Sequence, residues 1–493
     1  MIDNMKKLDL LSYTCYGLTG IIYLFIVFNT LTNPQNPDLV IKAGTILPLM
    51  AVTAVTVLAG TYIIYHFKYR KIFPVLFTVI LVFLQAVAIH YLSVKYHVET
   101  WDMGVVYNAA EYYVTNGAFD MGKYDYFLWF PNNSPLYNIF VLLFKLFAAL
   151  GITNTQLALN VFNAGLLVVS AWFVEKTVQV FAGSDFTGAG LMFCVALCPF
   201  SLYAVLAYTD TFSMVFLSAA LYFYICAIKN KGNRYVNLVL FSLLCGFGAS
   251  LKVSVLILAI AAVIDIVLKN EDLKTTAISL VLVLVIAFGG FAGFKYAHEH
   301  SAFLPEYDYN YTIPYTHWVM MGLNGLGGYN DDDYQLITLQ YPDKQSRQQA
   351  NIDEIIRRVE EKGGDGMIQH LKNKLSFIYS EGTFGACYKL DRAVVRPNGL
   401  HEYIIYLGTK FEYLGNFSLA LFMMMLSFLS AGVIMGIKNR DSSAAMPAMS
   451  LIGVTIFLLI WEARARYILN FLPLFILMAV FGIKQLFYHN KNQ

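Results

Sequence analysis

An acidic residue beside an apolar segment opens the first long polar stretch of the sequence. Asp102 follows Trp101, and because tryptophan is typical of the membrane–water interface, we expect Asp102 to lie at the membrane surface. A carboxylate there can act as a general base on a hydroxyl group and still reach a lipid-linked substrate. Glu111 lies in the same stretch and could bind a sugar hydroxyl. An equally favoured alternative is that the aromatic residues anchor the interface while the acids are solvated.

A second acidic residue, Asp210, lies in a Tyr208-Thr209-Asp210 motif that follows Pro199. Proline interrupts the preceding helix, so the motif starts a new apolar segment. Asp210 could cap the N-terminus of that segment, or it could bind a sugar together with Tyr208. The two roles are compatible.

Lys252 is embedded in a nearly continuous apolar stretch, residues 235–268. The stretch is too long for one span, and we interpret it as two short helices that turn near Gly246, Gly248 and Ser250. A lone lysine in lipid costs about 2.5–3.5 kcal/mol, which favours a function such as phosphate binding. The alternative is that its ammonium group snorkels to the nearby interface.

Two arginines lie in a Trp-Glu-Ala-Arg-Ala-Arg-Tyr turn between two apolar segments. We expect Arg464 and Arg466 outside the cytoplasm, although Lys and Arg are usually enriched in the cytoplasmic loops of membrane proteins. The planar guanidinium group is suited to phosphate oxygens. Together with Lys252, the arginines could bind the head group of a polyprenyl phosphate. An ion pair between Glu462 and an arginine is the alternative.

His317 and Trp318 precede a glycine-rich stretch that ends in three aspartates, 331–333. Aromatic and acidic residues in this combination are suited to stacking on a sugar and to binding its hydroxyl groups. A structural role explains His317 equally well. We favour a solvated turn over a Ca²⁺ or Mg²⁺ site for the aspartates, so no metal ligand and no firm cofactor is predicted.

The composition requires a lipid environment for the elements that carry these residues. Of the 493 residues, 58% are hydrophobic and 13% are charged, whereas soluble domains contain about 25% charged residues. The net charge of +2 does not indicate nucleic-acid binding. The six cysteines lie mostly in apolar segments and predict neither a disulfide framework nor a metal site. The basic start runs into a long apolar segment, which predicts a retained helix rather than a signal peptide.

The apolar segments predict an all-α polytopic membrane protein with about twelve transmembrane helices. The predicted crossings are 10–30, 46–66, 72–94, 155–181, 187–205, 211–228, 235–250, 253–268, 275–295, 411–437, 444–460 and 467–485. A further segment, 135–150, begins with Pro135 and contains Lys145, so we expect a short re-entrant or tilted helix there.

Basic residues in the short loops place both termini in the cytoplasm and two long loops, 95–134 and 297–402, outside. The second loop is expected to contain amphipathic helices around 352–361 and 367–378, separated by a glycine pair. Long loops in membrane proteins usually carry function, so we expect an extracytoplasmic active site.

Asp102 in the first outer loop, the Tyr208-Thr209-Asp210 motif, Lys252 and the Glu-x-Arg-x-Arg-Tyr turn together resemble the GT-C superfamily. The resemblance covers about residues 72–485. Its members are multi-spanning glycosyltransferases that use polyprenyl-phosphate sugars, including protein mannosyltransferases. The resemblance implies inverting transfer to an extracytoplasmic glycan, lipid or protein. It also implies that Asp102 is the catalytic base and that Lys252, Arg464 and Arg466 contact the donor phosphate.

The sequence departs from the pattern of this superfamily in two respects. The catalytic loop usually follows the first helix, whereas here it follows the third. Protein mannosyltransferases carry adjacent acids in that loop, whereas Asp102 has only Glu99 and Glu111 nearby. The expected division is an added helix pair (1–71), a GT-C-like core (72–296), a large outer loop (297–410) and C-terminal helices (411–493).

Sequence patterns in the large outer loop indicate which acceptor the protein uses. Its Tyr-Thr-His-Trp and Gly-Gly-Tyr-Asn-Asp patterns are similar to those of uncharacterised Gram-positive cell-envelope members of the superfamily, which favours a wall polysaccharide or teichoic acid. Two other classes remain open: a transporter or flippase of lipid-linked sugars, and a polymerase or ligase of lipid-linked glycans. A transporter should carry charge through the middle of the membrane, whereas the charges here are expected near one face.

Overall fold

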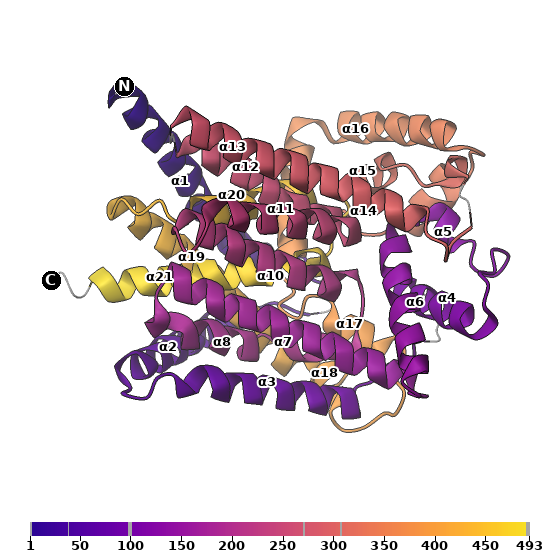
Figure 1. Cartoon of the computed structure of the whole chain (residues 1–493), viewed down its shortest axis with the longest axis horizontal. Helices are drawn as coiled ribbons and strands as arrows, with labels where there is room; N and C mark the ends of the chain where they lie inside the picture. The colour runs from indigo at the N-terminus through magenta and orange to yellow at the C-terminus, as the bar shows by residue number, and fades with distance from the viewer. Residues whose placement is uncertain (1, 38, 97–100, 270–271, 306–307, 490–493) are drawn as a thin grey trace.

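A computed structural model describes residues 2–37, 39–96, 101–269, 272–305 and 308–489. Glu99 lies outside these residues. The long helices run side by side along the longest axis of the molecule (Figure 1). Apart from an isolated bridge between Val94 and Val394, the described residues form helices, turns and loops. The prediction of an all-helical chain is confirmed.

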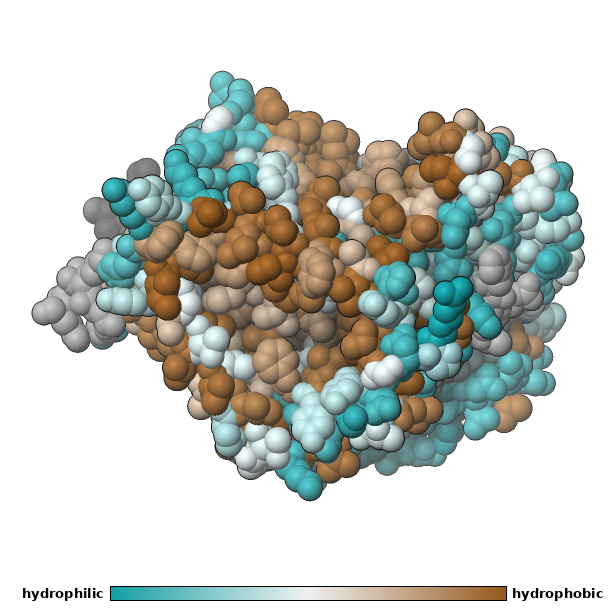
Figure 2. Space-filling view, turned by 90° about the horizontal axis from the view of Figure 1, so that it is seen from below, coloured by the Kyte–Doolittle hydropathy of each residue, from teal (hydrophilic) through white to brown (hydrophobic). Residues whose placement is uncertain are grey.

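Nine helices of the described chain are long and apolar enough to cross a membrane. They are Ser12–Thr32 of α1, α2 (Ala43–His66), α3 (Ile72–Tyr91), α7 (Thr155–Phe181), α10 (Thr209–Ile228), α11 (Arg234–Leu251), Leu273–Glu299 (α13 to α14), α19 (Phe411–Lys438) and Ala465–Phe487, which includes most of α21 (Leu472–His489). Figure 2 shows a broad apolar area over the middle of one face, as expected for contact with lipid.

The other predicted crossings are bent or short. The pair Ser184–Ala196 and Pro199–Val205 is bent by 66° at the proline, and it counts as a tenth span if the two helices cross together. Two further apolar helices, Val253–Leu268 and α20 (Ala445–Ile460), are shorter than a typical span. Helix lengths alone therefore support nine or ten crossings among the described residues rather than twelve.

The helices of the two long polar stretches lie toward the end of the bundle that is opposite to both termini (Figure 1). Here α6 (Ser134–Ala149) runs across the direction of the long helices, next to α4 (Asp102–Asn116). Helix α16 (Lys344–Tyr379) covers both amphipathic segments expected in the large loop and breaks at Gly363, where φ is 57°. Glycine adopts this left-handed conformation without the steric cost of a side chain.

The turn between α11 and α12 (Leu256–Leu268) differs from the expectation. The chain leaves helical geometry at Lys252, where φ is −152° and ψ is 103°, and not at Gly246 or Gly248, which lie inside α11. Gly246 instead allows close packing between helices, because a Cβ atom there would lie 2.9 Å from the carbonyl oxygen of Ala287. The glycines therefore serve helix contact, and the break in the helix places Lys252 itself.

Candidate functional site

The first turn of α10 carries a buried carboxylate. Tyr208 is the N-cap residue of α10, so Asp210 lies inside the first turn and does not cap the helix. The Asp210 side chain is only 2% exposed, and its Oδ1 atom accepts a hydrogen bond from the ammonium group of Lys252. Its Oδ2 atom lies 3.7 Å from Nε of Arg466 and has no hydrogen-bond partner. One carboxylate thus holds two cations from distant parts of the sequence.

Arg466 also contacts two aromatic rings. Its guanidinium carbon lies 5.5 Å from the ring centroid of Tyr208 and 5.4 Å from that of Tyr467. The Tyr467 hydroxyl donates a hydrogen bond of 2.9 Å to Glu462, whose pKa is raised by burial. The Glu462 carboxylate is therefore hydrogen-bonded to a tyrosine of its own turn. Arg464 interacts electrostatically with Glu462 and Tyr467 at the edge of this group, and its guanidinium carbon lies 5.8 Å from the ring centroid of Phe377 in α16.

Asp102 is the exposed first residue of α4, and its carboxylate interacts electrostatically with the same group of side chains. The Tyr126 hydroxyl lies within electrostatic reach of Asp102, and burial together with the Asp102 charge raises the pKa of Tyr126. Asn133 donates a hydrogen bond of 2.6 Å to the Tyr126 hydroxyl and accepts one of 3.0 Å from Tyr208. Asp102 also interacts electrostatically with Arg466. Electrostatic interactions therefore link the acid to the cation cluster, and we refer to these side chains together as the polar network.

Lys389 is a member of this network that the sequence analysis missed. It lies in α17 (Ala386–Asp391), and its ammonium nitrogen is 5.2 Å from the ring centroid of Trp101 and 5.9 Å from that of Tyr208. Burial and the nearby Arg466 lower its pKa to about 7, although the carboxylates of Asp102 and Asp210 oppose the shift. No periodicity or motif marks this lysine in the large loop, so only the tertiary structure reveals it.

A buried lysine of α16, Lys374, holds the arginine-containing turn in place. Its ammonium group donates hydrogen bonds to the carbonyl oxygens of Gly322 at 2.7 Å, Leu459 at 3.0 Å and Trp461 at 2.7 Å. The last two oxygens belong to the C-terminal end of α20, where carbonyl groups lack helical partners. Burial lowers the pKa of Lys374 to about 7. Lys374 thus fixes the backbone that leads to Arg464 and Arg466.

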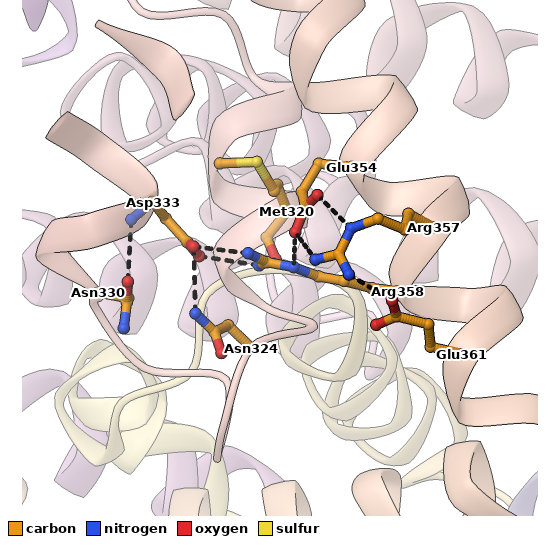
Figure 3. Close-up of polar contacts among 8 residues, drawn as sticks. All are labelled: Met320, Asn324, Asn330, Asp333, Glu354, Arg357, Arg358 and Glu361. Carbon is orange, nitrogen blue, oxygen red and sulfur yellow. Dashed lines mark hydrogen bonds and ion pairs between the residues drawn. The ribbon is translucent and has the colours of Figure 1, made fainter. Parts of the chain in front are cut away.

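The acidic stretch of the large loop serves a structural role at Asp333. Figure 3 shows Arg358 extending from α16 toward Asp333, with hydrogen bonds of 2.6 and 2.9 Å to its two carboxylate oxygens. Asn324 donates a further hydrogen bond of 3.1 Å to Asp333, and Arg358 also donates to the carbonyl oxygen of Met320. Asp333 is buried, whereas Asp331 and Asp332 are exposed. The ion pair anchors the loop to α16.

His317 makes its contacts within the large loop, whereas Trp318 reaches the turn that contains the arginines. His317 is buried, and its Nδ1 atom lies 2.7 Å from the Thr338 hydroxyl; burial lowers its pKa to about 4. These contacts favour the structural role for His317. The Trp318 ring stacks on Trp461, with a centroid distance of 5.5 Å and an angle of 7° between the planes. One face of Trp318 is therefore occupied by a residue next to the arginine-containing turn.

Glu111 belongs to a different region of the surface. It accepts a hydrogen bond of 3.0 Å from Tyr107 in the preceding turn of α4, and it lines a cavity on that side of the helix. The predicted site residues thus divide into two groups. Asp102, Tyr208, Asp210, Lys252 and Arg466 form one network, which Arg464 borders, while Glu111 and His317 have their contacts elsewhere.

The described part of the chain contains no group of three or more His, Cys, Asp and Glu that could hold a metal ion. The fold and the polar network define a helical integral membrane protein with a charged site where the candidate spans α10 and α11 meet the turn before α21. Residues 11–487 match the family described as conserved hypothetical integral membrane protein, and the chain belongs to this family. No curated protein and no solved structure shows a significant match to the chain.

Proposed function

We propose that the protein is a membrane glycosyltransferase that moves a sugar from a polyprenyl-phosphate donor to an extracytoplasmic acceptor. The observation that supports this proposal is the connection between the exposed Asp102 and the cations held by Asp210. A base for the acceptor and a positive site for the donor phosphate thus lie in one network. The resemblance to the GT-C superfamily, found in the sequence, agrees with this assignment.

The proposed reaction is a single displacement. The acceptor oxygen forms a bond to the anomeric carbon of the sugar, while the bond from that carbon to the phosphate oxygen breaks. Asp102 takes the hydroxyl proton, and the polyprenyl phosphate leaves with the bonding electron pair. Arg466 and Lys389 stabilise the negative charge of the leaving group, with Lys252 as a partner of Asp210 and Arg464 at the edge of the site.

The proposed arrangement in the membrane has twelve crossings. It counts the bent pair at Pro199 as one span and the two short apolar helices as one span each, in addition to the nine long helices. Helix α6 lies across the bundle and does not cross. Both termini are then cytoplasmic, and the polar network faces outward with the large loop. We favour a cell-envelope polysaccharide or teichoic acid as the acceptor.

Turnover by the purified protein tests the proposal. The protein in lipid nanodiscs is given a radiolabelled polyprenyl-phosphate sugar and, separately, candidate wall-polymer, lipid and peptide acceptors. Appearance of a singly glycosylated acceptor and free polyprenyl phosphate supports the proposal. In sealed vesicles, movement of the intact donor across the bilayer without bond cleavage identifies a flippase instead. Transfer of a whole preassembled glycan identifies a polymerase or ligase. Either of these two results contradicts the proposal.

A further inference from the structure

A groove lies along α4 at a distance from the charged network. Its volume is about 610 Å³, which falls in the range of about 300–1,000 Å³ that is typical of ligand sites. Its walls come from α4, the segment that contains Lys123 and Tyr124, the end of α6 and the start of α7. Because α7 is a candidate membrane span, the groove lies beside one end of a span.

Glu111 of the groove and Asp102 lie on opposite sides of α4, and Asp102, Asp210 and Arg466 are not among the residues that line the groove. Glu111 lines the groove, and it follows Asp102 by nine residues, or about two and a half turns of an α-helix. A half-integral number of turns directs two side chains to opposite sides of the helix. The groove is therefore separate from the site proposed for sugar transfer.

The lining combines neutral polar groups, aromatic rings and apolar side chains. Hydrogen-bonding groups come from Asn108, Tyr112 and Thr115, whose hydroxyl also donates to the carbonyl oxygen of Glu111, and the apolar side chains include Phe144 and Ala148. An amide both donates and accepts hydrogen bonds, and a hydroxyl group does the same, which matches the hydroxyl groups of a polyol. A tyrosine ring adds an apolar face for C–H groups.

The charges of the lining balance each other. Glu111 supplies one carboxylate and Lys123 one ammonium group, whose nitrogen lies 5.3 Å from the ring centroids of both Tyr112 and Tyr124. A site for an anionic ligand such as phosphate would carry an excess of positive charge. The balance favours an uncharged ligand with many hydroxyl groups.

We propose that this groove binds a neutral saccharide. The saccharide is either a free oligosaccharide or the head group of a glycolipid that reaches the groove from the adjacent membrane. Binding at this site does not depend on the proposed transferase activity, because neither Asp102 nor the cation cluster contributes to the groove.

Binding measurements on the full-length protein in nanodiscs test this proposal. The probes are neutral disaccharides of hexose and N-acetylhexosamine, a matched disaccharide that contains uronic acid, and nanodiscs that contain a diglucosyl diacylglycerol. Saturation-transfer NMR and titration calorimetry measure the soluble probes, and native mass spectrometry measures the glycolipid. A response to the soluble neutral probes indicates a free oligosaccharide, whereas a response to the glycolipid alone indicates a lipid-borne head group.

Two neighbouring alanines of α6 provide a matched pair of variants. Ala148 and Ala149 are both exposed, but only Ala148 is among the residues that line the groove. Ala148→Trp should fill the groove and weaken binding at least 10-fold, while Ala149→Trp and Asp102→Asn should retain it. The proposal is overturned if no neutral probe binds, if the uronic acid binds as well as the neutral disaccharides, or if both tryptophan variants have the same effect.

Discussion

The Lys252 ammonium group donates a hydrogen bond to the Asp210 carboxylate, although 42 residues separate the two in the sequence. Asp210 lies in the first turn of α10 and Lys252 occupies the break between α11 and α12. Burying either charge alone would be costly, so each residue accounts for the presence of the other. Because Arg466 also approaches Asp210, the carboxylate organises a cationic site rather than merely neutralising one lysine.

Loss of the lysine should leave the Asp210 carboxylate without its hydrogen-bonded partner. Removal of one member of a buried pair costs about 3–5 kcal/mol, so Lys252→Met should lower the thermal midpoint strongly. Asp210→Asn combined with Lys252→Met should be less destabilising than the sum of the single changes, with a coupling of about 1–3 kcal/mol. Lys231→Met, at an exposed loop lysine, is the control. Additive effects in the double variant would contradict the pairing.

Lys374 should be essential for the conformation of the arginine-containing turn. Lys374→Met would leave the carbonyl oxygens of Gly322, Leu459 and Trp461 without this donor, at about 1–3 kcal/mol for each one left unsatisfied. We therefore expect loss of thermal stability and loss of donor binding together. Lys372→Met changes an exposed lysine one half-turn away in the same helix and should be neutral. If both variants had the same thermal stability and the same donor affinity, Lys374 would not position the turn.

Alanine substitutions at the neighbouring residues Asp333 and Asp332 should have very different effects on the free energy of unfolding. Asp333→Ala removes two hydrogen bonds from the buried Arg358, which keeps Glu354 as a partner, and should cost about 1–3 kcal/mol, whereas Asp332→Ala changes an exposed side chain and should cost little. Thermal unfolding and limited proteolysis of the large loop measure the difference. If added Ca²⁺ or Mg²⁺ stabilised the wild-type protein and neither aspartate variant, the acidic stretch would be a cation site instead of an anchor.

Donor affinity should depend on pH through Lys389. Its pKa of about 7 reflects burial and the neighbouring Arg466, opposed by Asp102 and Asp210. The ammonium form dominates below this pH, so binding of a sugar phosphodiester should weaken as pH rises through about 7. Lys389→Arg keeps its charge and should remove this dependence. A wild-type profile without a step near pH 7 would show that Lys389 does not assist binding.

The lowered pKa of Lys389 also makes the free energy of unfolding depend on pH. An unfolded lysine has a pKa of about 10.4, so the unfolded state binds more protons between pH 7 and about 10. Lys389 therefore contributes a stability increment that rises with pH across this window and is lost as pH falls through about 7.

The sequence was most informative where a residue conflicted with its surroundings. A lysine in an apolar stretch is costly without a partner, and so are arginines in a turn that is predicted outside the cytoplasm. In the structure Lys252 and Arg466 have the same partner, Asp210. The same reasoning could not find Lys389, because a lysine in a polar loop conflicts with nothing in its local sequence.

The directions of individual side chains were not predictable from their positions in the sequence. Glu111 shares a helix with Asp102, but the helical period turns it to the other side. His317 and Asp333 looked suited to sugar binding, yet contacts formed only in the folded loop use them for structure. Proximity along the chain therefore did not predict membership in the site.

The most direct test compares two aspartates of the first polar stretch in a donor-turnover assay. Asp102→Asn should reduce release of polyprenyl phosphate from a labelled donor about 10²–10⁴-fold, the contribution expected of a general base. Asp125→Asn, at another exposed acid of that stretch, should leave the rate unchanged, and both variants should reach the membrane at the wild-type level. Wild-type turnover by the Asp102 variant would contradict the assignment of the catalytic base.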